Sequence, residues 1–447
     1  MSNFEEQGKV FCQWLESNGA TLNKDIAIKD YRSEGAGRGV VATNDIKEGD
    51  LLFSLPRNIL LSQLTTSLKD LDGIGKEYLE LPGWSPLILS LMYESQKQDS
   101  FWKPYFDVLP RNFSTPMFWD QQDLKELDGT DIVSKIGKED AEATYERDIK
   151  PIVEKYSDIF DKNVHNLDLY HLCGSLIMSY SFNDELQKAE KEQKEEEAED
   201  SEEEEEEEEE EQGLISMVPM ADLLNHKTGY NNARLFHEQD SLQMKAIKNI
   251  AKGEQIYNTY GDLCNADLLR KYGFVDDINE FDIVELDGPL VVECSCPEAD
   301  EELVEKKIDF LMEEGVLDEC FVIDTEYEIP QELIIAVHVL LATSDEFEKM
   351  EEKQKLPKPK LTQEVKNVIE NILKKRLEQR YETSLEEDEA ELAKLKDFSN
   401  KRNALIVRIG EKKILKKTLE KLQSTPIVVE KRSSTAINRN AAKKQKK

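Results

Sequence analysis

Hydrophobic residues near the start of the chain recur at helical spacing and then give way to alternating patterns. Phe11 and Leu15 lie on one predicted helical face, and Gly19 ends that helix. The segments "GRGVVA" (37–42) and "LLFSLP" (51–56) follow and flank a polar turn. Alternation on both sides of a turn is typical of a β-hairpin. The beginning of the chain therefore predicts one helix followed by strands.

Two long stretches then have helical periodicity. The first covers about residues 85–181, and strand patterns resume after it as far as about residue 261. The second covers about residues 290–423 and contains amphipathic segments such as "TQEVKNVIENILKKRLEQRY". These patterns predict an α+β fold. We expect a β domain at 1–285, interrupted by a helical insertion, and an all-α C-terminal domain at 290–423.

The net charge of −36 is unevenly distributed along the chain. Residues 184–211 hold 19 acids and three lysines, so this stretch alone carries −16. Such a composition cannot build a core, and we expect a disordered loop at about 186–212. This loop is either simply exposed to solvent or attracts a basic substrate through its negative charge. The acidic balance argues against a nucleic-acid binder and favours a basic protein partner.

Several features indicate a soluble protein in a reducing compartment. The six cysteines are scattered, and the start of the chain has no apolar signal-peptide core. The longest apolar run, Leu333–Ala342, is too short to cross a bilayer. The basic tail at 424–447 could be a nuclear localisation signal, an arm that contacts the ribosome or simply a disordered terminus. We expect a monomer located in the nucleus, or also in the cytoplasm, with no membrane partner.

Two segments of the chain echo each other. "ATNDIKEGDLL" (42–52) and "AIKNIAKGEQI" (246–256) share Ala, Ile, Gly, an acidic residue and a final Leu or Ile at equal spacing. Each predicts a strand, a tight turn and a second strand. Two ordinary hairpins would explain the echo. A pseudo-repeated β fold, with its halves separated by the helical insertion, would explain it as well.

Two short motifs are candidates for ligand binding. "GAGRG" (35–39) lacks the Lys-Ser/Thr of a phosphate loop and precedes a strand, so its glycines would instead let a ligand approach the backbone. "MVPMADLLNH" (217–226) ends in Asn225-His226, which could be a turn cap and a core histidine. The sparse histidines form no H-x₃-H pair, and Cys294 and Cys296 have no third cysteine close behind them, so a metal site is not indicated.

Tyr257, Tyr260 and Tyr272 cluster within "QIYNTYGDLCNADLLRKYGF". They could be ordinary buried core tyrosines. They could also line a narrow channel for a long alkyl-amine side chain, because aromatic faces favour both its methylenes and its cation.

Five segments in a fixed order carry a resemblance to a known family: "GAGRGVVA", "EGDLLFSLP", "MVPMADLLNH", "GEQIYNTYG" and "KYGF". Each is weak alone, but the ordered set resembles the SET-domain protein-lysine methyltransferases. The helical C-terminal part is similar to the substrate-binding domain of the Rubisco large-subunit methyltransferase group. Within that group, the chain is most similar to the branch of SET-domain-containing protein 6 and the fungal ribosomal-protein lysine methyltransferases. The resemblance covers about residues 1–420.

The resemblance implies a site for the cofactor S-adenosylmethionine and a lysine substrate. Tyr260 matches the catalytic tyrosine, and Asp222 matches a position near the substrate lysine. Tyr257 and Ser181 complete the expected substrate site. The implied cofactor-binding residues are Ala36, Gly37, Arg38, Tyr180, Asn225, His226 and Tyr272.

One departure from the family bears on metals. Histone-type members often read Asn-His-Ser-Cys and use that cysteine, with a cysteine-rich tail, to bind zinc. This chain reads Asn-His-Lys-Thr, and Glu301 stands where the third tail cysteine would be. We therefore expect no metal, and histones become weaker candidates for the main substrate.

The implied reaction is methyl transfer from S-adenosylmethionine to a lysine amine. The amine must be neutral, although its ordinary pKa is near 10.4. Burial in an apolar channel would lower that pKa. The fungal relatives imply monomethylation of a lysine on a large-subunit ribosomal protein. The alternative is a non-catalytic SET-fold module, or an acidic chaperone for basic ribosomal proteins or histones.

Overall fold

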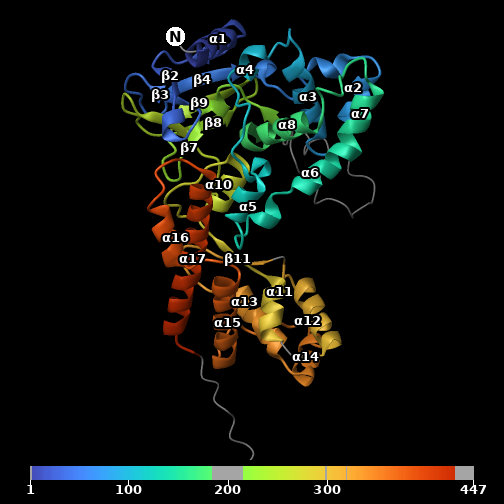
Figure 1. Cartoon of the computed structure of the whole chain (residues 1–447), viewed down its shortest axis with the longest axis vertical. Helices are drawn as coiled ribbons and strands as arrows, with labels where there is room; N and C mark the ends of the chain where they lie inside the picture. Colours follow the sequence, from blue (N-terminus) through green and yellow to red (C-terminus); the bar gives the residue numbers. More distant parts are fainter. Residues whose placement is uncertain (1–2, 184–214, 297–299, 319, 428–447) are drawn as a thin grey trace, which may run out of the picture. The chain divides into compact units, whose positions relative to one another are not determined.

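The computed structural model describes residues 3–183, 215–296, 300–318 and 320–427 (Figure 1). The acidic segment at 186–212 and nearly all of the basic tail lie outside the described residues. The chain divides into two compact units. The first unit contains residues 1–125, 134–280 and 397–403, and the second contains 126–133, 281–396 and 404–447.

Two four-stranded sheets form the β part of the first unit. The first sheet contains, in spatial order, β1 (Thr21–Leu22), β4 (Leu51–Pro56), β9 (Ser241–Ala246) and β8 (Ala233–His237). The second contains β2 (Ile26–Asp30), β3 (Arg38–Ala42), β10 (Gln255–Asn258) and β7 (Asn225–His226). All neighbours are antiparallel except β10 and β7, which run parallel. Both sheets therefore combine strands from before and after the helical insertion.

The two similar turns of the sequence pair with each other. Ile46 and Ile250 exchange backbone hydrogen bonds of 2.9 Å in both directions. The Asp45 carboxylate accepts a backbone hydrogen bond from the second turn at 2.9 Å, and the Asn249 amide oxygen accepts one from the first at 3.0 Å. Each contact has its counterpart in the other turn. This reciprocity favours the pseudo-repeat over two unrelated hairpins.

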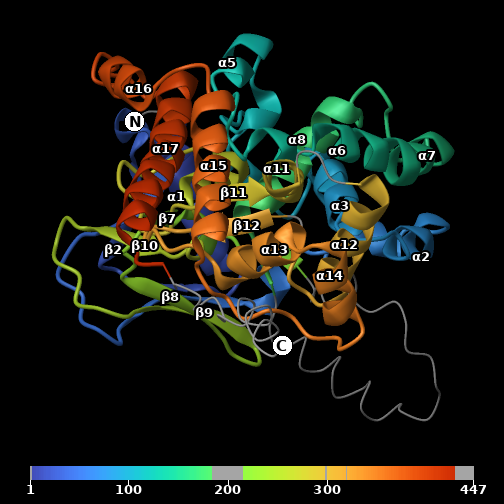
Figure 2. The same ribbon diagram turned by 90° about the horizontal axis from the view of Figure 1, so that it is seen from below.

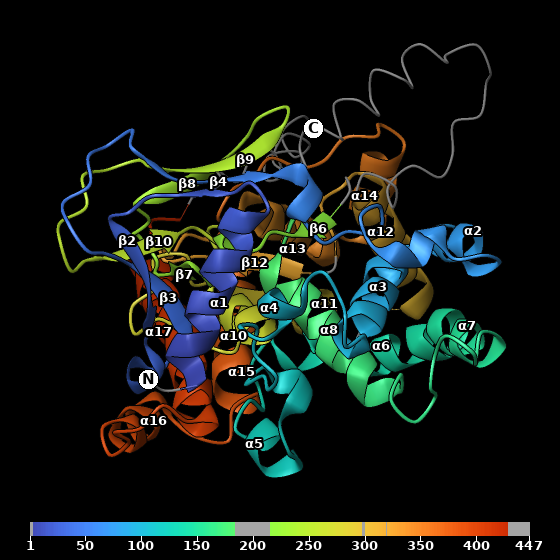
Figure 3. The same cartoon turned by 90° about the horizontal axis from the view of Figure 1, so that it is seen from above.

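Among the helices of the first unit, α1 (Asn3–Ser17) precedes both sheets in the chain, and the others up to α8 lie between strands β4 and β5 (Ser181–Asn183). These others are α2 (Ile74–Leu79), α3 (Ser85–Gln96), α4 (Lys103–Phe106), α5 (Gln121–Lys125), α6 (Lys138–Thr144), α7 (Lys150–Lys155) and α8 (Leu167–Tyr180). Helices α3 and α8 pack side by side (Figure 3). The side chain of Asn166 caps α8 by accepting a hydrogen bond from the Leu169 amide at 3.1 Å.

Short elements connect the insertion to the second half of the unit. Strands β5 (Ser181–Asn183) and β6 (Ile215–Met217) pair antiparallel on either side of the acidic segment. A 3₁₀ turn at Ala221–Leu223 leads into β7, and α10 (Asn265–Tyr272) follows β10. These connections bring the ends of the insertion next to the Asn-His motif.

The second unit is largely helical, as its sequence predicts. Its helices are α11 (Gly288–Ser295), α12 (Glu301–Glu313), α13 (Gln331–Leu341), α14 (Ser344–Glu351), α15 (Gln363–Gln379), α16 (Leu385–Leu392) and most of α17 (Asn400–Ser424). Helices α11, α13 and α15 pack around one hydrophobic core (Figure 2). The unit also contains a feature that the sequence did not predict, an antiparallel pair of strands, β11 (Val284–Asp287) and β12 (Cys320–Ile323).

Capping boxes begin two helices of the second unit. Thr343 and Glu346 form one box at the start of α14, and Ser384 and Glu387 form another at the start of α16. In each box, the hydroxyl accepts from a backbone amide while the carboxylate accepts from the cap residue's amide.

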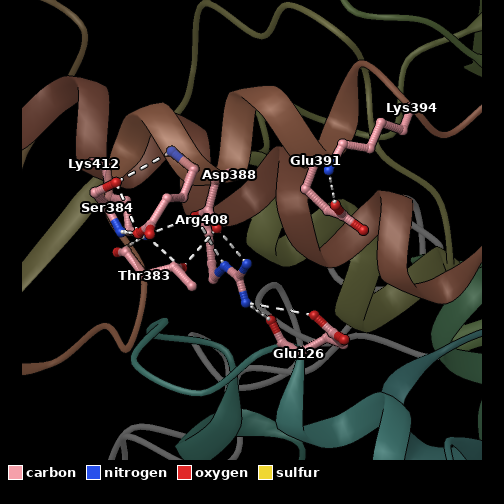
Figure 4. A network of polar contacts seen from close by, with 9 residues as sticks. Glu126, Thr383, Ser384, Asp388, Glu391, Lys394, Arg408 and Lys412 are labelled. Carbon is pink, nitrogen blue, oxygen red and sulfur yellow. Dashed lines mark hydrogen bonds and ion pairs between the residues drawn. The ribbon is translucent and has the colours of Figure 1, made fainter.

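A buried polar network joins α16 to α17 within the second unit (Figure 4). The Asp388 carboxylate accepts hydrogen bonds from the Arg408 guanidinium at 2.5 Å, from the Lys412 ammonium at 2.6 Å and from the Thr383 hydroxyl at 2.7 Å. Arg408 also donates to the backbone oxygen of Glu126 at 3.0 Å. Burial alone would raise the pKa of Asp388, but the hydrogen bonds from Arg408, Lys412 and Thr383 together lower it. The carboxylate therefore neutralises two otherwise costly buried cations.

Candidate functional site

The Asn-His motif forms a short strand that fixes a histidine beside a tyrosine. β7 pairs with β10 so that Asn225 lies opposite Tyr257. The backbone amide of Tyr260 donates to His226 Nδ1 at 3.1 Å. Burial lowers the pKa of His226, so its imidazole is neutral and Nδ1 can accept. The motif thus positions the segment that carries Tyr260.

Tyr260 belongs to a cluster of aromatic rings. Its ring stacks on that of Tyr272 with a centroid distance of 4.4 Å, and on the imidazole of His226 at 5.2 Å. Phe274 meets Tyr260 edge-on at 6.4 Å. The Tyr260 hydroxyl donates to the backbone oxygen of Leu224 at 3.0 Å. Because burial raises the pKa of Tyr260 well above its ordinary value, this hydroxyl stays protonated.

Asp222 is a buried carboxyl group close to these phenols. Its exposed fraction is 4%, and the Tyr105 hydroxyl donates to its Oδ2. Its Oδ1 is buried and has no hydrogen-bond partner among the described residues. Burial raises the pKa of Asp222 to about 8, although Tyr105 and nearby backbone amides partly offset this effect. Burial also raises the pKa of Tyr180, and the charge of Asp222 raises it further.

The Gly-rich turn closes on itself and leaves open space beside its backbone. Tyr31 exchanges backbone hydrogen bonds with this turn, accepting from Ala36 at 3.1 Å and donating to Gly37 at 2.9 Å. A Cβ atom on Gly37 would meet nothing within 4 Å. A Cβ on Gly39 would lie 2.7 Å from Asn225 Nδ2, so only glycine lets that amide approach. The turn and the Asn-His motif therefore meet at one place.

Asn225 and this turn have the properties of a ligand-binding site. Among the described residues, the buried Nδ2 of Asn225 has no hydrogen-bond partner. A buried donor without an acceptor is costly, and a bound ligand would remove that cost. The residues therefore fit a cofactor that brings polar acceptors to the turn.

Arg38 serves a different purpose from its neighbours in the turn. Its guanidinium donates to the Val108 backbone oxygen at 2.9 Å and to Gln7 Oε1 at 3.1 Å, and lies 3.7 Å from the centroid of the Phe4 ring. The side chain thus anchors the strand to α1 and to the loop after α4. Its Nε is buried and has no hydrogen-bond partner among the described residues, so Arg38 remains a predicted cofactor-binding residue.

The structure separates the remaining predicted residues. Tyr180 ends α8 and belongs to the Asp222 and Tyr260 group, and Ser181 follows it as the first residue of β5. Tyr257 lies on β10 opposite Asn225, and burial and the charges of Glu34 and Asp276 raise its pKa. The group around Tyr260 also includes Tyr180, which the sequence alone did not place with the other tyrosines, and Tyr257 remains a predicted substrate-binding residue.

Three residues of the site were missed by sequence reasoning. Tyr105 and Phe274 complete the surroundings of Asp222 and Tyr260. Phe398 lies against the Gly-rich turn, where a Cβ on Gly35 would come 2.7 Å from its ring. Phe274 stands in the quoted "KYGF" motif, but Tyr105 and Phe398 lie in unremarkable segments far from their contacts in sequence.

The structure contains no candidate metal centre in the part of the chain that it describes. There, no group of three or more His, Cys, Asp or Glu side chains is placed to hold a metal ion. Among the same residues, no helix is both long and apolar enough to cross a membrane.

Comparison with protein families and relatives identifies the two parts of the chain. The SET domain model matches residues 37–261, and the Rubisco LSMT substrate-binding model matches residues 298–415. The N-lysine methyltransferase setd6 of Danio rerio is 33% identical, over 91% of this chain and 93% of its own. Ribosomal lysine N-methyltransferase 4 of Saccharomyces cerevisiae is 34% identical, over 76% of this chain and 72% of its own.

Solved structures have the same fold. The SET domain of LSMT bound to lysine and AdoHcy superposes with a TM-score of 0.69 at 21% identity, over 94% of this chain and 92% of that one. Rubisco LSMT bound to AdoMet gives a TM-score of 0.68 at 20% identity, over 93% and 91%. With two matching domains and full-length relatives above 30% identity, the chain belongs to the SET-domain N-lysine methyltransferase family that carries a Rubisco LSMT substrate-binding domain.

Proposed function

We propose that this protein transfers a methyl group from S-adenosylmethionine to a lysine side chain of another protein. The observation that carries the proposal is the aromatic cluster around Tyr260, next to a buried carboxyl and a Gly-rich turn. A narrow aromatic environment suits the methylenes and the amine of lysine. The family membership of the chain supports the same reaction.

The cofactor would bind at the Gly-rich turn and the Asn-His motif. Ala36 and Gly37 offer backbone groups beside open space, and Asn225 offers a buried donor that lacks a partner among the described residues. His226 and Tyr272 line the same region through their stacking with Tyr260. When bound, S-adenosylmethionine supplies an electrophilic methyl group on a sulfonium. Solved relatives in complex with AdoMet and with AdoHcy support this assignment.

Tyr260 would align the amine for an in-line displacement. Its hydroxyl remains protonated, and the neutral His226 holds its backbone in place. The lone pair of the amine must point at the methyl carbon, and such alignment can supply roughly 7–11 kcal/mol of a barrier. Tyr180 and Asp222 complete the wall of the lysine channel, with Ser181 next to Tyr180 in the chain. No covalent enzyme intermediate is needed.

The substrate we propose is a lysine of a basic, large-subunit ribosomal protein, which would be monomethylated. The yeast relative is named a ribosomal lysine N-methyltransferase. The net charge of −36 would steer a basic protein toward this one. We propose that residues 1–285 form the SET domain, that the helical region at 290–423 binds the substrate protein, and that the enzyme acts as a nuclear monomer.

Mass spectrometry of ribosomal proteins tests the proposal. Ribosomes from cells that lack the gene would be incubated with the purified protein and S-adenosylmethionine, and their peptides analysed before and after. We expect one lysine to gain a single methyl group, with no gain when Tyr260→Phe replaces the wild type. Binding of S-adenosylhomocysteine, measured by calorimetry, provides the second readout.

The outcomes separate the competing functions. Cofactor binding without ribosomal methylation would leave a lysine methyltransferase with a different substrate. If cofactor binding is also absent, the catalytic proposal is wrong, and a SET-fold module or acidic chaperone for basic proteins becomes the better explanation.

A further inference from the structure

A lysine side chain enters any site as an ammonium, and methyl transfer requires the neutral amine. The proton must therefore leave the amine in the site or on the way to it. Among the described residues around Tyr260, the phenols stay protonated, because burial raises the pKa of Tyr260 and of Tyr180. His226 is occupied, since its Nδ1 accepts a hydrogen bond from Tyr260. The buried carboxyl of Asp222 is the remaining base.

The two oxygens of Asp222 have different surroundings. Oδ2 receives the hydrogen bond of the Tyr105 hydroxyl, and Tyr105 itself is fully buried. Oδ1 is buried and has no partner among the described residues. A buried carboxyl oxygen without a donor is costly, and this points to a ligand that supplies one. A lysine ammonium is such a donor.

The backbone around Asp222 restricts the carboxyl further. Met220, two residues earlier, has a φ of 82°, which is unfavourable for a residue with a side chain, and it is buried. The Asp222 amide donates to the Val218 backbone oxygen at 3.3 Å, which closes the turn. Strain of this kind persists only where the surroundings impose it. The carboxyl is therefore held in place both by its own turn and by Tyr105.

The charge of Asp222 acts on phenols from three elements. They are Tyr105 on α4, Tyr180 on α8 and Tyr260 after β10, and only Tyr105 in turn lowers the pKa of Asp222, together with the backbone amides of Met220 and Asp222. All three are neutral, and no cation among the described residues contributes to the pKa shift of Asp222. The protonation of Asp222 therefore depends on burial, on its hydrogen bonds and on any cation that binds beside it.

We propose that Asp222 accepts the proton of the substrate ammonium at Oδ1, and that Tyr105 is a positioning residue that holds the carboxyl for this step. The inference rests on the proposed function, since the donor is the substrate lysine. The N–H bond of the ammonium breaks and an O–H bond forms on Oδ1, which leaves a neutral amine and a neutral carboxyl. The amine's lone pair would then form the bond to the methyl carbon while the bond from that carbon to the sulfonium sulfur breaks, so that the sulfur leaves as a neutral thioether and the lysine becomes a methylammonium. Asp222 releases its proton to water before the next turnover.

The pH profile of methylation tests both roles. Initial rates on acid-extracted large-subunit ribosomal proteins would be measured for the wild type, Tyr105→Phe and Asp222→Asn. The wild-type kcat/KM should rise with pH as Asp222 ionises. Tyr105→Phe removes a donor that stabilises the carboxylate, so the rise should move to higher pH by about one unit. Below the midpoint, kcat/KM of Tyr105→Phe should be about tenfold lower than that of the wild type, and at high pH the two values should become equal.

Tyr78→Phe is the matched control. Tyr78 on α2 is also fully buried, and its hydroxyl donates to the Gln63 backbone oxygen. Its loss should leave the midpoint of the pH profile unchanged. A uniform loss of rate at every pH in Tyr105→Phe would mean that Tyr105 only supports the fold, and would overturn its positioning role. Unchanged kinetics in Asp222→Asn would overturn the proton transfer.

A second measurement does not depend on methylation. The ¹³C carboxyl resonance of Asp222 would be followed by NMR over pH in the ligand-free protein, and its absence from Asp222→Asn identifies it. The midpoint should be raised further in Tyr105→Phe and should not move in Tyr78→Phe. No shift in Tyr105→Phe contradicts the positioning role even if the protein methylates lysine. A shift without any methylation of proteins would contradict the proposed function instead.

Discussion

The rings of Tyr260 and Tyr272 stack with a centroid distance of 4.4 Å, although Tyr260 precedes α10 and Tyr272 is the last residue of that helix. The stack fixes the plane of the Tyr260 ring. The hydrogen bond from its hydroxyl to the Leu224 backbone oxygen fixes the position of the hydroxyl end of the ring. Tyr260 is therefore held rigidly before any substrate arrives, as expected of a residue that aligns reactants.

The Tyr260→Phe variant should fold normally, bind the cofactor and lose most of its turnover. The stacking survives because the ring remains, but the hydroxyl that aligns the amine is lost. We expect kcat to fall about 100-fold or more, since small misalignments of reacting atoms have effects of that size. Single-turnover methylation measures the loss, and calorimetry with S-adenosylhomocysteine measures cofactor binding. Normal turnover in this variant would exclude the assigned role.

Phe398 should contribute to cofactor binding through the Gly-rich turn. Its ring lies against Gly35, and its segment is fixed by an ion pair between Arg402 and Asp277 at 2.5 Å. Phe398 is 63% exposed, so only the side of its ring that faces Gly35 is lost in Phe398→Ala; this should loosen the turn and raise the Kd for S-adenosylhomocysteine by up to about tenfold. Phe236→Ala, which changes another partly exposed phenylalanine on β8, should leave that Kd unchanged.

An equal effect of both phenylalanine variants would contradict a specific role for Phe398. Gly35→Ala provides an independent check. Gly35 has a φ of 80°, which costs an alanine about 1–2 kcal/mol, and the added Cβ would collide with the Phe398 ring. This variant should therefore bind the cofactor more weakly than Phe398→Ala does.

Local signals predicted the elements of the site better than its contacts. The Gly-rich turn, the Asn-His motif and Tyr260 were selected from short local segments, and their ordered set, through its resemblance to the SET-domain family, implied their roles. The pairing of Tyr105 with Asp222 joins residues 117 positions apart, and a lone tyrosine in "KPYF" contains no signal of its partner. The packing of Phe398 on Gly35 spans most of the chain for the same reason.

The fold shows the same division between local and long-range information. Helical periodicity predicted the second unit, but strands β11 and β12 contain only four residues each, too few for alternation to stand out. The starts of α14 after Thr343 and of α16 after Ser384 depend on capping boxes. Those boxes were readable in the sequence, because each places a Glu three residues after a Thr or Ser.

Asp222 should make the stability of the protein depend on pH. Burial raises the pKa of its carboxyl to about 8 from an ordinary value near 3.8. A carboxyl group whose pKa is higher in the folded than in the unfolded protein contributes its full stabilisation of the fold below the unfolded-state pKa. That contribution is lost as the pH rises through the folded-state pKa. The free energy of unfolding of the wild type should therefore fall between about pH 4 and pH 8, relative to Asp222→Asn.

The size of that change is on the order of 5 kcal/mol, from about four pKa units at 1.36 kcal/mol each. Urea unfolding of both proteins at several pH values measures the difference. Parallel stability curves for the wild type and Asp222→Asn would show that the carboxyl ionises as freely in the folded protein as in the unfolded one. Binding of a lysine-containing peptide should reduce the pH dependence, because its cation favours the ionised carboxyl.

The network of Asp388, Arg408 and Lys412 should be essential to the second unit. Asp388 is 1% exposed, and its carboxylate neutralises two largely buried cations (Figure 4). Asp388→Ala would leave Lys412 without this counterion and Arg408 with only the Glu126 carboxylate, 3.7 Å away, and breaking a buried pair typically costs about 3–5 kcal/mol. The ion pair of Glu391 and Lys394 at 2.9 Å lies on the exposed side of the same region. Glu391→Ala should cost under about 1 kcal/mol, because water screens such pairs.

Urea unfolding followed by circular dichroism measures both variants against the wild type. A large loss in Asp388→Ala with little change in Glu391→Ala would locate the stabilising charge in the buried network. Equal, small losses would mean that water reaches Arg408 and Lys412 once the carboxylate is removed. The double variant Asp388→Ala with Lys412→Met distinguishes the cause, since removing one buried cation should recover part of the lost stability only if that cation was left uncompensated.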